Sequence, residues 1–407
     1  MSSNQVFPTR VLAVAVLLAP AGPTLANGFR LPDQDAFATA RGEAFAATAD
    51  NPSAIYYNPA GITQLSGHQV RGGVYGLKLD ITYEAPDGQK FTNGDDLHAV
   101  PQFFYTFSPE KLPLSFGLGI YSPYGLSSEW PDDTGFRSIA TQGRLSYYTF
   151  NPVAAWRISP QLSLAGGLTV NYGDTDLRQG FFTPLPGYGD TFQFKGDGMA
   201  LGFNAGVLWK PITQLQFGVN YRSATTLDFQ GYTDLSSPTL NAHQDASAEF
   251  KFPQNVVMGV SWRPTPVWNL EFNLDWTDWN RLDTVTINQS PLPSVDLVLN
   301  WESSFYYEFG VTRYLKGGWS VSAGYIFNEN SVPEANYQPL VADQDRHFIS
   351  VGVGYQGQHL GIDLAYQFGY GPSRTVAGSV VNSLGQSADG EYKFLSNALL
   401  LSAGWRF

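Results

Sequence analysis

The chain has 407 residues and a net charge of −12, and only 14% of its residues are charged although 43% are hydrophobic and 15% aromatic. So many large apolar side chains exclude an intrinsically disordered protein, and the negative charge argues against nucleic acid as a partner, because its phosphates need Lys and Arg. No segment reaches the ~18 consecutive apolar residues of a membrane-spanning helix, which excludes a helical transporter but leaves open a membrane protein built of strands.

The first 26 residues have the pattern of an export signal peptide. Arg10 supplies the positive charge, residues 11–19 form the longest apolar run, and residues 24–26 are a cleavage site. Cleavage after Ala26 would start the mature chain at Asn27. Because the chain contains no cysteine, we expect the exported protein to fold without disulfide bonds.

Residues 27–67 form a separate N-terminal segment. The stretch 35–50 is rich in alanine, which favours short helices, and the Asn51-Pro52 and Asn58-Pro59 steps predict turns. The segment is too short to be an independent domain and too apolar to stay free in the periplasm. We therefore predict that it is a partly helical plug, or hatch, and a disordered leader is the alternative.

From residue 68 to the C-terminus, the sequence has the period of two that is typical of β-strands. Between Trp268 and Trp276, apolar residues alternate with Asn, Glu and Asp, so successive side chains point to opposite faces of a sheet. Bacterial single-chain barrels have even strand numbers, and about fourteen strands fit this length, with twelve or sixteen as alternatives. The predicted strands are 68–84, 98–108, 113–123, 143–158, 161–182, 198–210, 214–230, 245–263, 266–288, 297–315, 317–328, 345–357, 358–371 and 390–407.

The alternation must be combined with the aromatic residues to decide which face of the sheet meets water. In a soluble sandwich the apolar faces would pack against each other, whereas in an outer-membrane barrel they face lipid, with aromatic residues at both interfaces. Trp268 and Trp276 lie at the two ends of one apolar face, about 27 Å apart at ~3.4 Å per residue. This matches the apolar band of a barrel. We therefore predict a 14-stranded antiparallel transmembrane β-barrel over residues 68–407, whose polar face lines a hydrated lumen.

The connections between the predicted strands are of two kinds. Tight turns, such as the one at Ser159-Pro160, alternate with long connections rich in Pro and Gly, which we expect at the outer surface. The last strand ends in Phe407, and the outer-membrane assembly machinery recognises a terminal aromatic residue in such barrels. A barrel of this width cannot be filled by its own side chains, so it either conducts water or carries a plug.

Five motifs, in order along the chain, resemble the FadL/TodX family of outer-membrane transporters for long-chain fatty acids and other hydrophobic compounds. The resemblance implies a barrel of fourteen strands in the Gram-negative outer membrane, an N-terminal hatch, and diffusive import without ATP or TonB. The motifs are Asn-Gly-Phe-Arg-Leu at 27–31, Tyr-Asn-Pro-Ala-Gly-Ile-Thr at 57–63, Ser-Pro-Tyr-Gly-Leu at 122–126, Tyr-Arg-Ser at 221–223 with Asp-Phe-Gln-Gly at 228–231, and Asp-Gln-Asp-Arg at 343–346.

An opening in the barrel wall is predicted at Pro123, Tyr124 and Gly125. Proline has no ladder donor and is expected only at edges or bulges, so strand pairing would be interrupted where the third strand should continue. The alternative is that the strand ends at Ser122 and a loop begins. By analogy with the family, the interruption is a kink that lets a hydrophobic substrate leave sideways into the membrane.

Several residues are candidates for ligand contacts and gating. The turn Asn58, Pro59 and Ala60 is also interpreted as a hatch that shifts when ligand binds. The resemblance implies that Phe29 lies at an inner binding site and that Arg178, near the end of the fifth strand, binds a carboxylate; the second basic position of the family falls in 295–301, which has no Lys or Arg. An apolar capture groove at the outer surface is predicted from Phe181, Phe182, Leu185, Tyr188, Leu126 and Trp130.

We therefore predict passive, ligand-gated import of hydrophobic compounds, with long-chain fatty acids as the first candidate and uncharged hydrocarbons as the second. A general water-filled porin is the alternative from another class. No Gly-x-Ser-x-Gly motif is present and the five histidines are far apart in sequence, so no catalytic residue, metal or cofactor is predicted. The expected partners are the ligand, outer-membrane lipid and lipopolysaccharide, and the assembly machinery, with the protein acting as a monomer.

Overall fold

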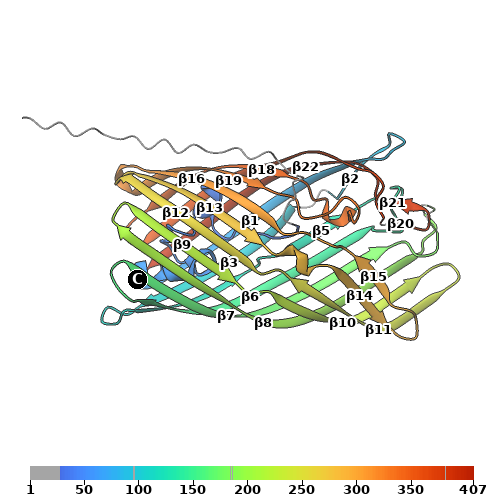
Figure 1. Cartoon of the computed structure of the whole chain (residues 1–407), viewed down its shortest axis with the longest axis horizontal. Coiled ribbons are helices and arrows are strands. Elements are labelled where there is room, and N and C mark those ends of the chain that lie inside the picture. The colour runs from blue at the N-terminus through green and yellow to red at the C-terminus, as the bar shows by residue number, and fades with distance from the viewer. Residues whose placement is uncertain (1–27, 95–96, 184, 186, 381) are drawn as a thin grey trace, which may run out of the picture.

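The computed structural model describes residues 28–94, 97–183, 185, 187–380 and 382–407 (Figure 1). The predicted signal peptide and its cleavage site lie outside the described residues. Within the described ranges, no helix is long and apolar enough to cross a membrane.

A closed antiparallel β-barrel makes up most of the molecule. Fourteen strands of the described chain form the ring, each paired with the next one along the chain, and β1 pairs with both β3 and β22, which closes the barrel. The predicted fold class and strand number are therefore confirmed. The ring consists of β1 (Gly67–Glu84), β3 (Leu97–Ser108), β4 (Leu114–Tyr121), β6 (Gln142–Arg157), β7 (Leu162–Gln179), β8 (Thr191–Ile212), β9 (Leu215–Arg222), β12 (Asn255–Thr265), β13 (Trp268–Thr277), β16 (Ser304–Tyr314), β17 (Trp319–Asn328), β18 (Arg346–Gln356), β19 (Leu360–Val376) and β22 (Gly390–Arg406).

The two ends of the barrel differ. At the end that holds the C-terminus, the connections are short turns, one of which contains the 3-10 helix η3 (Lys316–Gly318). At the other end, additional strands and long connections extend the wall (Figure 1). We call these the short-turn end and the long-loop end. The elements at the long-loop end are β2 (Lys90–Thr92), β5 (Gly125–Glu129), β10 (Thr225–Ser236), β11 (Asn241–Phe252), η2 (Trp279–Arg281), β14 (Thr284–Gln289), β15 (Val295–Val298), η4 (Pro339–Val341), β20 (Asn382–Ser383) and β21 (Gln386–Ser387).

In the half next to the short turns, the outer face of the barrel is apolar and the inner face polar. On β13, Trp268, Phe272 and Trp276 point outward, while the alternating residues Glu271 and Asp275 are buried inside. This arrangement agrees with the sequence prediction that the apolar face of the sheet meets lipid. The inward polar residues contact the N-terminal segment, so they do not line open water.

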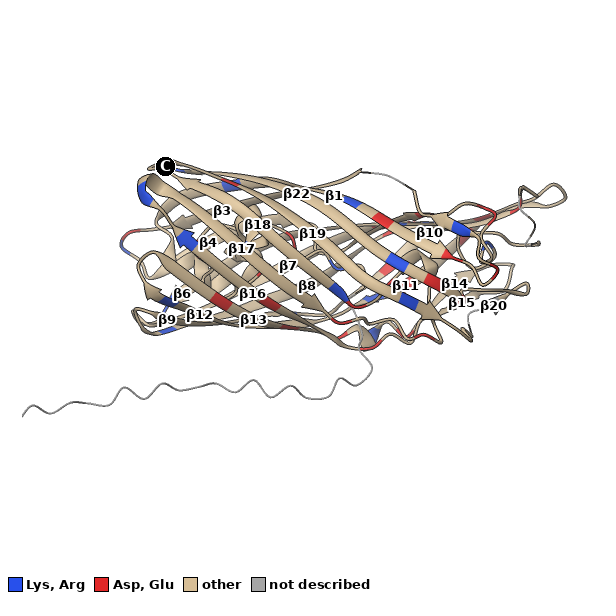
Figure 2. Cartoon of the chain, turned by 90° about the horizontal axis from the view of Figure 1, so that it is seen from above, with Lys and Arg blue, Asp and Glu red and all other residues tan. Residues whose placement is uncertain are grey.

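In the half next to the long loops, the polarity is reversed, which corrects the prediction of a hydrated lumen. The inward residues of β10 and β11 form part of a buried apolar cluster, and their outward neighbours are polar or charged (Figure 2). A strand such as β8, with 22 residues, rises roughly 55 Å at the tilt of a barrel, more than twice the apolar band of about 25 Å. This half therefore extends beyond the lipid, where the outside must be polar. Its inward apolar residues include Leu227, Phe229, Leu235, Ala246, Ala248, Phe250 and Phe252.

The N-terminal segment, residues 28–66, lies inside the short-turn half and is called the plug. It contains α1 (Ala36–Ala40), α2 (Ala54–Tyr57) and the 3-10 helix η1 (Pro59–Gln64). Asp35 caps α1 by accepting from the backbone N–H groups of Phe37 and Ala38, and Asn58 caps η1 in the same way. The wall faces the plug with glycines, and a Cβ atom at Gly218 or Gly324 would lie only 2.0 Å from plug backbone atoms. The plug therefore packs directly against the wall backbone.

Candidate functional site

The wall of the barrel is interrupted between β4 and β5. β4 ends at Tyr121, Pro123 has no N–H to donate, and β5 begins at Gly125. Beyond this point β5 pairs with β6 but not with β3, so that residues 97–102 of β3 have no strand partner on this side within the described chain. A gap in the wall pairing follows from these two observations.

The first residues of the plug pair with the kink, at the point where β5 begins. The Leu31 N–H donates to the Pro123 carbonyl (2.8 Å), and the Gly125 N–H donates to the Phe29 carbonyl (3.0 Å). These bonds flank an antiparallel bridge between Arg30 and Tyr124. The start of the plug is therefore held by the same backbone groups that a neighbouring strand would use.

The side chain of Phe29 is held in an aromatic cage. Its ring centroid lies 4.9 Å from that of Trp279, 5.5 Å from Trp301, 6.0 Å from Phe252 and 6.2 Å from Tyr124. These separations are those of favourable edge-to-face pairs. The cage brings together residues from the kink, β11 and the connections around η2, far apart in sequence.

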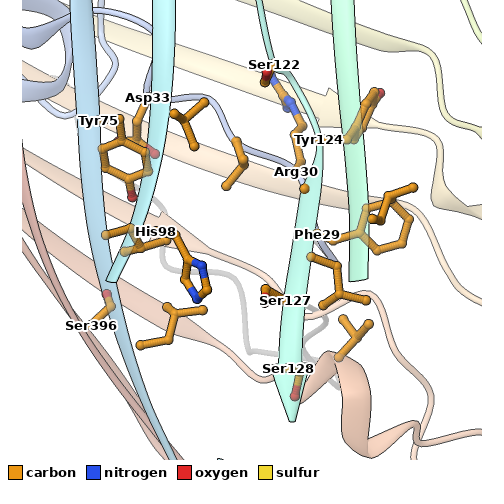
Figure 3. Close-up of a pocket in the computed structure, with 18 of the residues that line it drawn as sticks. Phe29, Arg30, Asp33, Tyr75, His98, Ser122, Tyr124, Ser127, Ser128 and Ser396 are labelled. Atoms are coloured by element: carbon orange, nitrogen blue, oxygen red, sulfur yellow. The ribbon is translucent and has the colours of Figure 1, made fainter. Parts of the chain in front are cut away.

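An interior cavity of about 650 Å³ lies beside Phe29 and reaches the gap. Figure 3 shows Tyr75 and His98, from β1 and β3, across the cavity from Phe29, Arg30 and Tyr124. This volume is within the range of cavities that hold small ligands. The lining also includes Leu97 and Tyr148, which are exposed on the outer face of the barrel. The cavity is thus bordered by both the apolar interior and the outer face.

The two arginines of the cavity that face the interior are each paired with an acid. Arg30 contacts Asp275 at 2.6 Å and donates to the Thr277 hydroxyl at 2.9 Å. Arg346 contacts Asp343 at 3.2 Å. Asp343 also accepts from the Gly28 N–H (3.0 Å), so the Asp-Gln-Asp-Arg motif holds the start of the plug.

Arg178 does not lie in the interior, where the resemblance predicted a carboxylate-binding residue. Arg178 lies on the outer face of the barrel with its register partners Gln142 of β6 and Gln193 of β8, and it pairs with Asp176 of β7 at 3.0 Å. The reason is the strand alternation, in which a shift of one residue reverses the face; Leu177, next to it, is the residue that packs on the interior cluster. This position does not support a role for Arg178 in holding a ligand inside the barrel.

The residues of the predicted capture groove are in different environments. Leu126 lines the cavity. Trp130 is buried, and its Nε1 donates to the Pro339 carbonyl at 3.0 Å. Phe181 packs on Phe182 with centroids 4.4 Å apart, whereas Phe182, Leu185 and Tyr188 are exposed at the long-loop end. The exposed set can form an apolar patch, but Trp130 belongs to the interior packing.

Asn58, Pro59 and Ala60 lie where the plug meets the wall. The Asn58 Nδ2 donates to the carbonyls of Ala46 (2.8 Å) and Val207 (2.9 Å), which ties the plug to itself and to β8. Its Oδ1 accepts from the Ala60 N–H at 3.2 Å. This geometry explains why Asn precedes Pro here, while the proposed movement of the turn stays a prediction.

Buried ionic contacts that were not predicted from the sequence also hold the plug. Glu271 of β13 accepts from the backbone N–H groups of Ala47 (2.8 Å) and Thr48 (2.9 Å) and contacts Arg41 at 3.5 Å. Arg71 of β1 is bonded to Asp35 and, at 2.8 Å, to Asp363. Inward acids on strands were visible in the sequence, but their partners are too far away along the chain for any spacing to reveal them.

The carboxyl groups of Asp33 and Glu43 meet inside the plug, which does not itself span the membrane. Burial raises the pKa of Asp33 to about 6, although hydrogen bonds with Glu43 and Gln367 oppose the shift. Burial, and then the charge of Asp33, raise the pKa of Glu43 well above its ordinary value. Because the folded pKa of Asp33 is raised, its stabilising contribution is complete below the ordinary value and is lost as the pH rises through about 6, and the raised pKa of Glu43 acts in the same direction.

From the Asp33 shift alone, we therefore expect plug docking to weaken by about 3 kcal/mol between pH 4 and pH 7, at about 1.4 kcal/mol per pKa unit. Hydrogen exchange of plug amides, corrected for the intrinsic rate, should be faster at pH 7 than at pH 5. Asp33→Asn should reduce this difference. Equal pH dependence in the variant and the unmodified protein would contradict the assignment to Asp33.

The described residues contain no group of three or more His, Asp and Glu placed to hold a metal ion.

A closed barrel with an apolar outer band, an interior plug and a cavity at a gap in its wall defines the class of plugged outer-membrane transport barrels. The chain belongs to the OMPP1/FadL/TodX family, because the family model for "outer membrane protein transport protein" matches residues 17–407. It is therefore a protein of the Gram-negative outer membrane, and its short-turn end faces the periplasm.

Known relatives are similar to this chain over almost its whole length. The long-chain fatty acid transport protein of Escherichia coli (strain K12) is 23% identical, and the match covers 92% of this chain and 94% of that protein. Outer membrane protein P1 of Haemophilus influenzae is 24% identical, over 89% and 90% of the two chains.

Two solved structures have the same fold. The crystal structure of a Pseudomonas aeruginosa FadL homologue matches with a TM-score of 0.84 at 20% identity, covering 93% of this chain and 99% of that chain. The Ralstonia pickettii toluene transporter TbuX matches with a TM-score of 0.73 at 16% identity, over 92% and 98% of the chains.

Proposed function

We propose that the protein is a passive, ligand-gated channel that imports hydrophobic compounds, with long-chain fatty acids as the first substrate class. The observation that carries this proposal is the interior cavity that borders the gap between β3 and β5. The match to a long-chain fatty acid transport protein over almost the full length supports the substrate class.

In the proposed pathway, a hydrophobic molecule enters among the exposed apolar residues of the long-loop end and passes through the apolar interior to the cavity. It then leaves sideways through the gap into the membrane. An acyl chain gains about 0.8 kcal/mol per CH₂ by entering lipid instead of water. Uptake in this direction therefore needs no external energy source.

The plug is the proposed gate. Phe29 fills the aromatic cage, and its neighbours along the chain pair with the kink, at the point where β5 begins. A ligand that takes the place of Phe29 would release this segment, and the movement would continue to the turn at Asn58, Pro59 and Ala60. The gate then opens only where a hydrophobic ligand is bound.

Uncharged hydrocarbons are the second candidate substrates. The observation that favours them is that Arg30 and Arg346, which face the cavity, already have acidic partners. A neutral molecule needs no further cation, and a toluene transporter is among the structures with this fold.

The proposal is tested by uptake into cells that lack their own transporter of this class. Cells that express the protein should take up radiolabelled oleate or toluene faster than cells with the empty vector, and uptake of small sugars should not change. Mass spectrometry of the purified protein should detect hydrophobic ligands. Faster sugar uptake without oleate or toluene uptake would identify a general porin instead.

The remaining expected partners belong to the membrane. The apolar band is proposed to contact outer-membrane lipid, with lipopolysaccharide around the charged outer face. Phe407 is exposed at the end of the last strand, as recognition by the assembly machinery requires. We propose that the monomer is functional, because the barrel closes within one chain.

A further inference from the structure

Arg222 is the last residue of β9, and its side chain is buried inside the barrel. It is the central residue of the Tyr-Arg-Ser motif and has no part in the function proposed so far. Its side chain is only 6% exposed. The guanidinium group lies over the ring of Tyr56 at 4.4 Å and that of Tyr121 at 5.6 Å. Its Nη2 donates to the Tyr56 carbonyl at 3.0 Å. Arg222 therefore connects the wall, the plug and the strand that ends at the kink.

This buried cation has no acidic partner among the described residues. Its Nε makes no hydrogen bond, and its ionisable neighbours are the three tyrosines Tyr121, Tyr56 and Tyr124 together with Arg30. A buried cation without a counter-charge is costly. The other buried arginines of the interior contact carboxylates: Arg30 contacts Asp275, Arg41 contacts Glu271, and Arg71 contacts Asp35.

A second, small cavity of about 20 Å³ lies between the plug and the wall, and Arg222 and Arg30 both line it. This volume is enough for about one water molecule. Arg30 and Pro32 line both this cavity and the large one. A polar group that moves from the large cavity past Arg30 would therefore reach Arg222.

Three carboxyl groups also line the small cavity, and each has a partner. Asp275 is paired with Arg30 at 2.6 Å. Glu43 accepts from the Tyr57 hydroxyl at 2.6 Å, and Glu308 accepts from the Asn273 Nδ2 at 2.8 Å. Burial raises the pKa of Glu43 well above its ordinary value, so that this carboxyl group stays neutral. Arg222 is the group that remains without a counter-charge.

We propose that Arg222 binds the carboxylate of an amphipathic ligand, whose apolar chain remains in the large cavity. A guanidinium stacked on a tyrosine ring keeps its N–H edge available, and this edge can bind a carboxylate through two parallel hydrogen bonds. Because the small cavity holds only about one water molecule, the carboxylate enters when the Phe29–Pro32 segment moves away from the kink. This inference rests on the proposed import of hydrophobic compounds and specifies the anionic class among them.

The test compares oleate with methyl oleate, which has the same chain but no charge. Binding of both to the purified full-length protein in detergent is measured for the unmodified protein, Arg222→Gln and Arg222→Lys. Arg222→Gln should weaken oleate binding by about 10- to 100-fold, the usual value of a hydrogen bond to a charged group, and leave methyl oleate binding unchanged. Arg222→Lys should restore part of the oleate affinity.

Arg263→Gln is the matched control. Arg263 is also a wall arginine that contacts the plug, but it has its own acid, Asp50, at 2.9 Å, and it does not line the small cavity. We expect no selective loss of oleate binding in this variant. Heat-dependent gel migration of each variant confirms that the barrel is folded.

Equal losses for oleate and methyl oleate in Arg222→Gln would show that Arg222 only supports the structure, and unchanged oleate binding would show that the carboxylate lies elsewhere. Either result overturns the assignment of Arg222 and leaves the proposed import intact. If the unmodified protein binds neither compound and transports no hydrophobic solute, the proposed function itself is wrong.

Discussion

Uptake of hydrophobic substrate is expected to fall by at least about tenfold when Pro123 is replaced by Ala and Gly125 by Val. A tenfold fall corresponds to about 1.4 kcal/mol in the equilibrium between the closed and the open wall. Alanine supplies the N–H that proline lacks, so β4 and β5 can continue as one strand along residues 97–102 of β3, which have no strand partner on this side within the described chain. A Cβ at Gly125 would lie 2.9 Å from the Leu31 Cδ1. The added valine therefore also forces the Leu31 side chain of the plug to move.

The measurement is oleate uptake by cells that express the double variant at the level of the unmodified protein. The variant should still migrate as a folded, heat-modifiable barrel. Gly166→Val is a control, because a Cβ at this position on the outer face of β7 has the Asn204 carbonyl at 3.9 Å as its nearest contact. Normal uptake by the double variant would show that the substrate does not leave through this gap.

The strand pattern of the barrel could be read from the sequence because alternation is a local property. The single predicted strands 214–230 and 245–263 correspond to pairs of strands, β9 with β10 and β12 with β11. The break after β9 occurs where the Ser223 hydroxyl accepts the Phe203 N–H at 2.9 Å and replaces a ladder bond. Such a side-chain bond depends on the neighbouring strand, which the local sequence does not show.

The reversed polarity at the long-loop end could not be read from alternation. A period of two separates the faces of a strand but does not say which of them meets water. On β13 the apolar residues face lipid, whereas on β10 Leu227 and Phe229 face the interior. Only the height of each residue relative to the apolar band decides between the two, and height is set by tilt and register across the whole barrel.

The site was predicted in part. The motifs located the kink at Pro123 and the plug turn at Asn58, because proline and asparagine have local structural effects. The cage around Phe29 includes Trp279 and Trp301, which lie about 250 or more residues away along the chain, and no sequence spacing indicates this contact. The family resemblance implied that Arg178 points into the barrel, whereas the structure places it on the outer face. A shift of one residue in the register of a strand is enough to reverse the face.

Loss of plug docking is expected when side chains are added at the wall glycines that touch the plug backbone. A Cβ at Gly218 would lie 2.0 Å from the Ala46 carbonyl oxygen, and a Cβ at Gly324 would lie 2.0 Å from the Gly42 nitrogen. Both contacts are with backbone, which cannot move aside as a flexible side chain can. We expect Gly218→Val with Gly324→Val to weaken plug docking by more than about 3 kcal/mol, the upper range for overpacking one site.

A barrel of this size without a seated plug conducts water, since only barrels of about eight strands are filled by their own side chains. The double variant should therefore give a steady ion conductance in planar bilayers and sensitise cells to large hydrophilic antibiotics, whereas the unmodified protein and Gly166→Val should do neither. Selective uptake of oleate over sugars should be lost at the same time, because the bore then admits any small solute. If the variant barrel is folded but remains closed to ions, the plug tolerates these side chains, and the direct packing of its backbone on the wall does not determine the seal.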